Sequence, residues 1–311
     1  MSMTQNNQET GWVQLITNEL DSQGIKSRRD LPLKEVSTFA IGGPCALSVF
    51  PQNANELIFA ADLAAKYSIK FEVVGKASNI LFSDDGYRGM IIFTSQMKQI
   101  SRKFTTDVFV EAGVNLTTAS LRASVWGLSG LEFACGIPGS CAGAVYMNAG
   151  AYGGEISDIL EYSEYYSITQ NKILTVSKDE HKFSYRHSIY QDNKDMIIIG
   201  AGLRLSEGSI DEIRSKMNEY TQKRRTSQPH EYPNAGSIFK RPPEGYAAKM
   251  IDDCGLKGLT IGGAQISEKH AGFIVNRNNA TARDVLTLIN VIKERVLAQF
   301  GIELECEIRI I

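Results

Sequence analysis

The chain has 311 residues, of which 43% are hydrophobic and 22% are charged, and its formal net charge is −2. A chain of this length and composition can form about two or three globular domains, each with its own core. Neither basic blocks nor an acidic tail is present, so we expect no nucleic-acid partner and no charged membrane-surface partner.

Helices and strands alternate through the first two thirds of the chain. Apolar residues at helical spacing predict a helix over residues 11–23, ended by Gly24, and a second helix after Pro51 with Asn53 or Asn55 as its cap. A third helix is expected at 117–126. Apolar runs predict strands at 46–50, 71–74, 90–93, 108–110, 165–169, 173–176 and 196–205.

The pattern changes near residue 206, where we place a domain boundary. Residues 209–212 form a capping-box sequence that opens a helix ending in a basic run. A longer amphipathic helix is expected over 282–300, with Thr281 as its cap and Gly301 as its end. Residues 302–311 alternate strictly, which predicts a strand with apolar residues on one face and charged residues on the other.

The N-terminal residues and the cysteines bear on the cellular compartment of the protein, and the histidines bear on whether it binds a metal. The nine residues MSMTQNNQE lack the apolar core of a signal peptide, and no stretch approaches the roughly 20 apolar residues of a membrane span. The five cysteines form no CxxC pair and are expected to be reduced thiols, and the four histidines show no metal-ligand spacing. We therefore expect a cytoplasmic protein without a metal.

The segment Gly136–Glu155, GIPGSCAGAVYMNAGAYGGE, is rich in glycine and alanine. Such a run lets main chain approach a ligand closely, because few Cβ atoms keep the ligand away. A flexible surface linker is the alternative, but linkers are polar and rich in serine. This run carries Ile137, Val145, Tyr146 and Met147, which favours a buried loop that contacts a ligand.

A second glycine-containing turn lies in VVGKASNILFSDDGYRG, residues 73–89. The turn that follows the expected strand can present its backbone amides, and the short polar side chains of Ser78 and Asn79, to an anion such as a phosphate. The segment fits neither the Walker loop nor the GxGxxG pattern, and an ordinary tight turn between strands is an equally open interpretation.

Three further positions are candidates for chemistry. Arg186 lies in FSYRHS, where a surface residue is the plain alternative, and Ser237 lies in NAGSIFK without the GxSxG pattern of a hydrolase nucleophile. Glu307 alternates with Glu303 and Glu305, so a solvated strand face is the default interpretation.

Together these motifs resemble the UDP-N-acetylenolpyruvoylglucosamine reductase family, flavoenzymes that act in peptidoglycan precursor synthesis and are also called UDP-N-acetylmuramate dehydrogenases. The resemblance covers nearly the whole chain from Thr38. It consists of seven motifs in order: STFAIGG, VGKASNILFSDDGYRG, GIPGSCAGAVYMNAGAYGGE, FSYRHS, YPNAGSIFKRP, GLKGLTIGGAQISEKHAGFIVN and ELECEIRI.

The resemblance implies an α+β fold with a two-part FAD-binding domain of the PCMH/vanillyl-alcohol-oxidase type and a C-terminal α+β substrate-binding domain. The expected segments are a helical lead at 1–30, the FAD-binding domain at 31–206 with subdomains 31–98 and 99–206, and the substrate domain at 207–311. Its last strand, 302–311, is expected to return to the active site. The short spacing from Arg186 to Ser237 is similar to that of the subgroup without a long tyrosine-bearing insertion.

The family resemblance also implies noncovalent FAD and NADPH as co-substrate. The residues expected to bind FAD are Val74, Gly75, Lys76, Ala77, Ser78, Asn79, Gly136, Ile137, Pro138, Gly139, Ser140, Gly143, Ala144, Asn148, Ala149 and Gly150. Lys76 stands where the family often has a further glycine, and it can add a positive charge near the phosphates.

The implied reaction reduces the enolpyruvyl group of UDP-N-acetylglucosamine enolpyruvate to UDP-N-acetylmuramate, with hydride passing from N5 of reduced FAD to C3. Ser237 matches the donor of a proton to C2, and Arg186 matches the cation that holds the carboxylate. Glu307 is expected to be protonated in the complex, its pKa raised by burial and negative charge, and to donate a hydrogen bond. Weaker candidates for substrate contacts are Tyr185, Arg225, Lys240 and Arg241.

Two alternatives stay open at this point. Another FAD-dependent oxidase or dehydrogenase of the same superfamily would share the glycine loops without needing Ser237 and Glu307, and a degenerate flavin- or nucleotide-sugar-binding protein would need no catalytic residue. We expect small-molecule substrates and a monomer.

Overall fold

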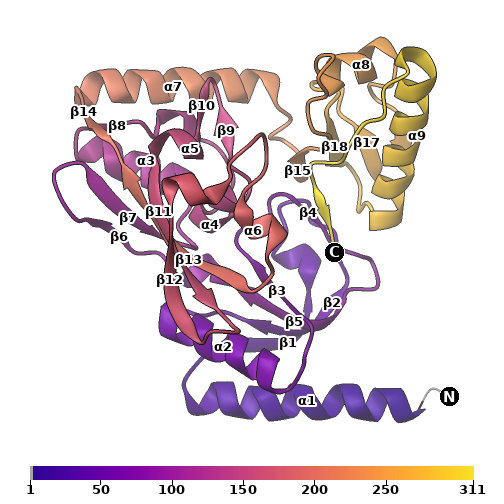
Figure 1. Ribbon diagram of the computed structural model, residues 1–311. Coiled ribbons are helices and arrows are strands. Elements are labelled where there is room, and N and C mark those ends of the chain that lie inside the picture. The colour runs from indigo at the N-terminus through magenta and orange to yellow at the C-terminus, as the bar shows by residue number, and fades with distance from the viewer. Residues whose placement is uncertain (1–2) are drawn as a thin grey trace. The chain divides into compact units, whose positions relative to one another are not determined.

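The computed structural model describes residues 3–311 and divides into two compact units (Figure 1). The first comprises Met1–Leu31, Cys45–Lys76 and Arg88–Thr221, and the second comprises Pro32–Pro44, Ala77–Tyr87 and Gln222–Ile311. Residues 1 and 2, part of the expected helical lead, lie outside the described residues. The division falls between Thr221 and Gln222 rather than near residue 206, and two earlier segments, Pro32–Pro44 and Ala77–Tyr87, also belong to the second unit. The functional domain limits remain predictions.

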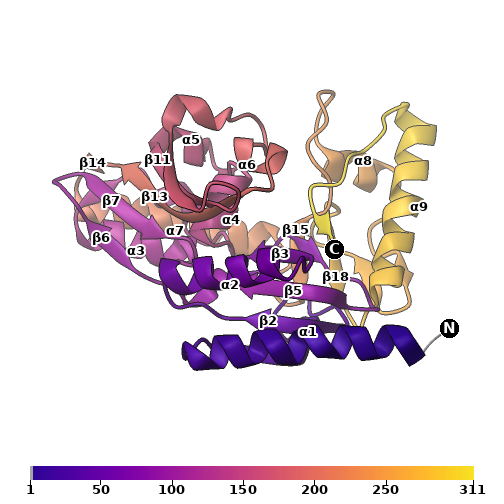
Figure 2. The ribbon, with the colours of Figure 1, turned by 60° about the horizontal axis from the view of Figure 1, so that its bottom comes forward.

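One sheet of the first unit has four strands in the order β1-β2-β5-β3, with β3 and β5 parallel. The strands are β1 (Ser27–Pro32), β2 (Pro44–Val49), β3 (Phe71–Val74) and β5 (Tyr87–Phe93). The helices α1 (Met3–Ser22) and α2 (Ala54–Lys66) lie beside this sheet (Figure 2) and share a buried core with it through Ile16, Leu57 and Met90. Of the two expected caps of α2, Asn53 is used: its side chain accepts from the Glu56 amide at 3.1 Å.

The other large sheet of the first unit is antiparallel, in the order β12-β11-β13-β7-β6. Its strands are β6 (Ile100–Arg102), β7 (Asp107–Glu111), β11 (Leu160–Ser167), β12 (Lys172–Ser177) and β13 (Met196–Arg204). The helices α3 (Leu116–Val125) and α4 (Cys141–Tyr146) supply Leu116, Ala144 and Val145 to its core. The strands expected in this region are therefore confirmed, with shifted ends.

Short helices and strands lie between these elements along the chain. They are η1 (Leu33–Glu35), η2 (Thr94–Gln96), β8 (Leu128–Ser129), η3 (Glu132–Ala134), β9 (Gly150–Ala151), β10 (Gly154–Glu155), α5 (Ile156–Ile159), η4 (Lys178–His181), α6 (Ile189–Asp192) and β14 (Ser206–Glu207). The helix α7 (Ile210–Ser227) begins in the first unit and ends in the second.

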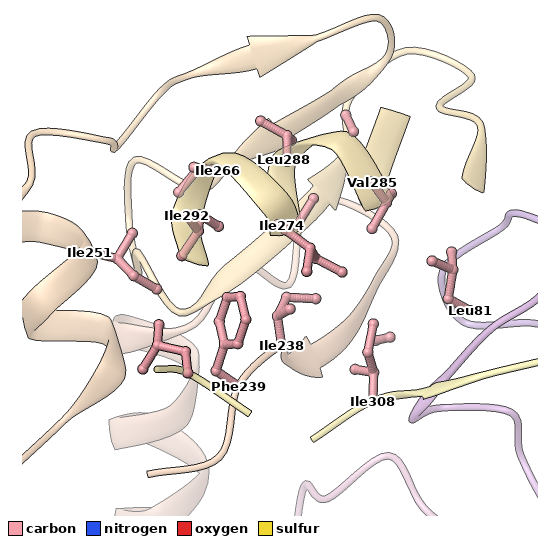
Figure 3. Close-up of a cluster of buried hydrophobic side chains, with 14 of the residues drawn as sticks. Leu81, Ile238, Phe239, Ile251, Ile266, Ile274, Val285, Leu288, Ile292 and Ile308 are labelled. Atoms are coloured by element: carbon pink, nitrogen blue, oxygen red, sulfur yellow. The ribbon is translucent and has the colours of Figure 1, made fainter. Parts of the chain in front are cut away.

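The second unit contains a four-stranded antiparallel sheet in the order β15-β18-β17-β16. Its elements are β4 (Ile80–Leu81), β15 (Asn234–Ser237), α8 (Ala247–Asp253), β16 (Thr260–Ile261), β17 (Ala264–Ile266), β18 (Phe273–Asn276), α9 (Ala282–Phe300) and β19 (Arg309–Ile310). Figure 3 shows the core, in which Leu288 and Ile292 of α9 face Ile238 and Phe239. The expected bounds of α9 are confirmed, with Thr281 as its cap and Gly301 left-handed at φ 70°.

Two sequence expectations differ from the structure. The first helix begins at Met3 rather than at residue 11, because the polar residues before Gly11 carry no apolar periodicity that would mark a helix. The expected strand 302–311 is regular only at Arg309–Ile310, where it pairs in parallel with β4. Leu304 and Ile308 are buried as the alternation predicts, but Ile310 is 53% exposed, in a pairing of only two strands, β19 and β4.

No helix within residues 3–311 is long and apolar enough to cross a membrane. All five cysteines are free thiols, as expected.

Candidate active site

In the first unit, the two predicted FAD segments meet at Gly75 and Ser140. A Cβ on Gly75 would lie 2.0 Å from Oγ of Ser140, so only glycine allows this approach. Ser140 is buried and caps α4, accepting from the Gly143 amide at 3.3 Å. The turn after β3 and the glycine loop are thus packed together by small residues.

This meeting point is rich in main-chain donors. Within residues 3–311 the amides of Lys76, Gly139 and Ser140 donate to no protein acceptor. Oγ1 of Thr94, 1% exposed, also has no hydrogen-bond partner in that part of the chain and lies 4.0 Å from the position of a Cβ on Gly75. Unpartnered donors beside a glycine fit a ligand with anionic oxygens, such as a pyrophosphate.

The glycine loop holds no reactive thiol. Burial raises the pKa of Cys141 to about 12, so this thiol stays protonated near neutral pH. At the other end of the loop Asn148 is buried with φ 40°. Its Nδ2 donates to the Ser184 carbonyl at 3.2 Å and its Oδ1 accepts from the Ser157 amide at 3.0 Å. The loop is therefore fixed at both ends.

Arg186 lies in a tight turn of the first unit. The amide of Ser184 donates to the carbonyl of His187 at 3.3 Å and the reverse bond is 3.1 Å, so Tyr185 and Arg186 form the tip of the turn. Nη2 of Arg186 donates to the Gly150 carbonyl at 3.4 Å, and its guanidinium carbon lies 5.0 Å from the centre of the Tyr185 ring. The guanidinium is thereby placed beside the end of the glycine loop.

In the second unit, Ser237 ends β15 beside a bulge. Gly236 is left-handed at φ 79°, and the pairing of β15 with β18 shifts register between Asn234 and Ser237. A bulge of this kind re-aims the side chain that follows it. Within residues 3–311 the Ser237 hydroxyl has no hydrogen-bond partner, which leaves it available to a ligand.

Glu307 lies next to this strand in the same unit. Its amide donates to the Ile238 carbonyl at 2.8 Å, and its carbonyl accepts from Nδ2 of Asn79 at 3.1 Å. The Asn79 carbonyl in turn accepts from the Arg309 amide at 2.9 Å. The segments that carry Asn79, Glu307 and Ser237 are therefore hydrogen-bonded side by side.

The remaining predicted residues are divided between the units. The first unit contains Val74, Gly75, Lys76, the predicted residues between Gly136 and Gly150, Tyr185 and Arg186. The second unit contains Ala77, Ser78, Asn79, Arg225, Ser237, Lys240, Arg241 and Glu307. Lys240 forms an ion pair with Glu305 at 2.5 Å, and Arg241 is exposed over the Tyr246 ring at 4.2 Å.

Thr38, which the sequence analysis did not single out, is hydrogen-bonded to the strand that ends at Ser237. Its Oγ1 donates to the Asn234 carbonyl at 2.9 Å, and the Asn234 amide donates to the Thr38 carbonyl at 3.1 Å. The same hydroxyl lies 3.4 Å from the Ala77 carbonyl. In the sequence, only the position of Thr38 in the motif STFAIGG could have drawn attention to this residue.

Comparisons with known proteins identify the family. Residues 228–311 match the model of the C-terminal domain of UDP-N-acetylenolpyruvoylglucosamine reductase, and residues 45–177 match an FAD binding domain. The UDP-N-acetylenolpyruvoylglucosamine reductase of Caldanaerobacter subterraneus is 45% identical over 280 residues, covering 90% of this chain and 92% of that protein. The chain belongs to the UDP-N-acetylenolpyruvoylglucosamine reductase family.

Other members of the UDP-N-acetylenolpyruvoylglucosamine reductase family agree. The reductase of Latilactobacillus sakei is 45% identical over 93% of this chain and 95% of its own. The crystal structure of the reductase from Thermus caldophilus has a TM-score of 0.79 at 33% identity, covering 92% of this chain and 99% of that one. The predicted family and the α+β fold with an FAD-binding domain and a family-specific C-terminal domain are confirmed.

Proposed function

We propose that this protein is an NADPH-dependent reductase that converts UDP-N-acetylglucosamine enolpyruvate to UDP-N-acetylmuramate, in the cytoplasm and as a monomer. Family membership supports the substrate class. The observation that carries the assignment of residues is the hydrogen-bonded neighbourhood of Asn79, Glu307 and the Ser237 strand. Two acid–base candidates and one predicted cofactor residue lie in adjacent segments of one unit.

The residues around Gly75 and Ser140 fit FAD. The glycine cradle admits a close main-chain approach, and the amides of Lys76, Gly139 and Ser140 can donate to a pyrophosphate. When bound there, FAD would supply the hydride chemistry between NADPH and C3 of the enolpyruvyl group. Lys76 is exposed and adds a positive charge for the phosphates.

Hydride addition at C3 leaves negative charge on C2 and the adjoining carboxylate. Arg186 stays cationic and holds that carboxylate as its charge grows. Ser237 gives its hydroxyl proton to C2; a hydroxyl is a weak acid, but an enolate carbon is basic enough to take the proton when the two are held in line. Glu307 is protonated in the complex and donates a hydrogen bond, because an ionised carboxylate would repel the forming charge.

Anaerobic half-reactions test this proposal. The purified protein should show flavin absorbance, lose it on adding NADPH, and regain it only on adding the enolpyruvyl sugar. Bleaching of the oxidised flavin by a hydroxylated small molecule, with no recovery of the NADPH-reduced flavin on adding the enolpyruvyl sugar, would favour another oxidase of the superfamily. Absence of protein-bound flavin after incubation with FAD and desalting would refute the proposal. Replacing NADPH by NADH in the first step measures the co-substrate preference.

A further inference from the structure

The main chain of Arg186 is strained. Its φ is 57°, a left-handed value that a residue with a Cβ adopts at a cost and that glycine or asparagine usually fills. Such a conformation persists only where its surroundings impose it, and it is a reason to look for the group that does so. The two main-chain bonds between Ser184 and His187 close the turn but leave the Arg186 carbonyl to another partner.

That partner is the side chain of Gln191. Its Nε2 donates to the Arg186 carbonyl at 2.8 Å and to the Tyr146 carbonyl at 2.9 Å. A side-chain amide nitrogen has two hydrogens, so both are used by these two carbonyls. Tyr146 is the last residue of α4, in the glycine loop, and Gln191 therefore joins the Arg186 turn directly to that loop.

Gln191 is itself held firmly. It lies in α6, which packs against α4 (Figure 1). Its neighbour Tyr190 is 3% exposed in the core of the first unit. Ser188, which precedes α6, donates from Oγ to the same Tyr146 carbonyl at 2.8 Å. The side-chain amide of Gln191 is therefore held by a helix that is itself packed in the core and hydrogen-bonded to α4.

We propose that Gln191 is a positioning residue of the reaction: it holds the Arg186 main chain in its strained conformation against the glycine loop, so that the guanidinium is fixed for the substrate carboxylate. This inference rests on the proposed role of Arg186. Because Gln191 acts through Arg186, its loss should affect the step in which a carboxylate is held and spare the reaction with NADPH, which carries no such carboxylate.

The variant Gln191→Met keeps the length of the side chain and removes its donor. We expect flavin content and the rate of reduction by NADPH to stay within about twofold, while reoxidation by the enolpyruvyl sugar slows about tenfold to a hundredfold, the range expected for a misplaced catalytic group. Gln191→Glu should be slower still, since its carboxylate would face two carbonyl oxygens. The matched control is Gln170→Met, at an exposed position in the turn between β11 and β12, which should match the unsubstituted protein.

A double-mutant cycle separates positioning from general stability. In an Arg186→Met background, adding Gln191→Met should change reoxidation by less than about twofold, because two residues that act through one group are not additive. A further readout without turnover is hydrogen exchange: the amides of Ser184 and His187 should exchange faster in Gln191→Met and not in Gln170→Met.

Three outcomes overturn the inference: equal slowing of both half-reactions, full additivity with Arg186→Met, or unchanged exchange at the turn together with normal reoxidation. These differ from failure of the proposed function, in which the unsubstituted protein itself would not be reoxidised by the enolpyruvyl sugar.

Discussion

Nδ2 of Asn79 donates to the main-chain carbonyl of Glu307 across 3.1 Å, although the two residues are 228 positions apart. The family resemblance implies that Asn79 binds the cofactor and that Glu307 acts in the reaction. One side chain therefore links the predicted cofactor turn to the segment that carries a predicted catalytic group. This link gives Asn79 a structural role in the second unit beside any contact with FAD.

Replacing Asn79 by alanine should weaken that unit as well as the reaction. The Glu307 carbonyl would lose the hydrogen bond from Asn79, and a bond of this kind contributes about 0.5–1.5 kcal/mol to stability. We expect a lower midpoint in urea and slower reoxidation by the enolpyruvyl sugar. Asn55→Ala, at an exposed position on α2, is the matched control and should leave both unchanged. An unaltered midpoint in Asn79→Ala would show that the bond contributes nothing to stability.

Ser237→Ala should separate the two half-reactions. The hydroxyl has no partner within residues 3–311, so its removal should leave the fold and the reduction by NADPH intact. Loss of a positioned acid slows its step by about 10²–10⁴-fold, and we expect that loss in reoxidation by the enolpyruvyl sugar. Stopped-flow absorbance measures each step. Equal loss in both would refute the assignment of the serine as proton donor.

Glu307→Gln distinguishes a hydrogen-bond donor from a proton carrier. If the protonated carboxyl only donates a hydrogen bond, the amide can replace it and reoxidation should stay near the unsubstituted rate. Glu307→Ala, which removes the donor, should slow that step. Collapse of reoxidation in Glu307→Gln would instead mean that the carboxyl transfers a proton.

The sequence predicted what local patterns encode and missed what distant contacts decide. The helix over 282–300 was found because apolar spacing, Thr281 and Gly301 all agree. Ser237, Arg186 and Glu307 were found through motifs. The bond from Gln191 to Tyr146 and the pairing of β4 with β19 leave no periodic or capping signal, because they join residues that only the folded chain brings together.

Gly75→Ala tests the cradle in the first unit. The added Cβ would lie 2.0 Å from Oγ of Ser140 and 3.0 Å from its Cβ, so one segment must move. Overpacking of this kind costs about 1–3 kcal/mol, and we expect a lower thermal midpoint and weaker FAD retention on a desalting column. Adding Ser140→Gly should restore part of both.

The control for that substitution is Gly11→Ala. A Cβ on Gly11 would meet nothing within 4 Å, and the residue lies inside α1. Alanine should therefore stabilise the helix by about 1 kcal/mol and leave FAD retention unchanged. Normal FAD retention in Gly75→Ala would show that the close approach to Ser140 does not shape the cofactor site.

His181 forms a buried hydrogen-bond chain with a fixed direction. Its Nδ1 lies 2.7 Å from the Ser177 carbonyl, which can only accept, so Nδ1 carries the hydrogen of the neutral ring. Nε2 then accepts from Oγ of Ser163 at 2.7 Å, and that oxygen accepts from the Tyr190 hydroxyl at 2.5 Å. Burial lowers the pKa of His181, because the charged ring would lose its solvation.

The stability of the fold should therefore fall as the pH drops below about 6.5, the ordinary pKa of histidine in an unfolded chain. Below that value the unfolded state binds a proton that the folded state refuses, so unfolding is favoured. Burial lowers the pKa of His270 as well and acts in the same direction. The carboxylates with lowered pKa values, such as Asp284, lose their contribution only at more acid pH. Thermal midpoints measured between pH 7 and pH 5 test this effect. His181→Gln should reduce the dependence of the midpoint on pH, and the control His230→Gln, at an exposed position, should not. An unchanged pH dependence in His181→Gln would contradict the role assigned to His181.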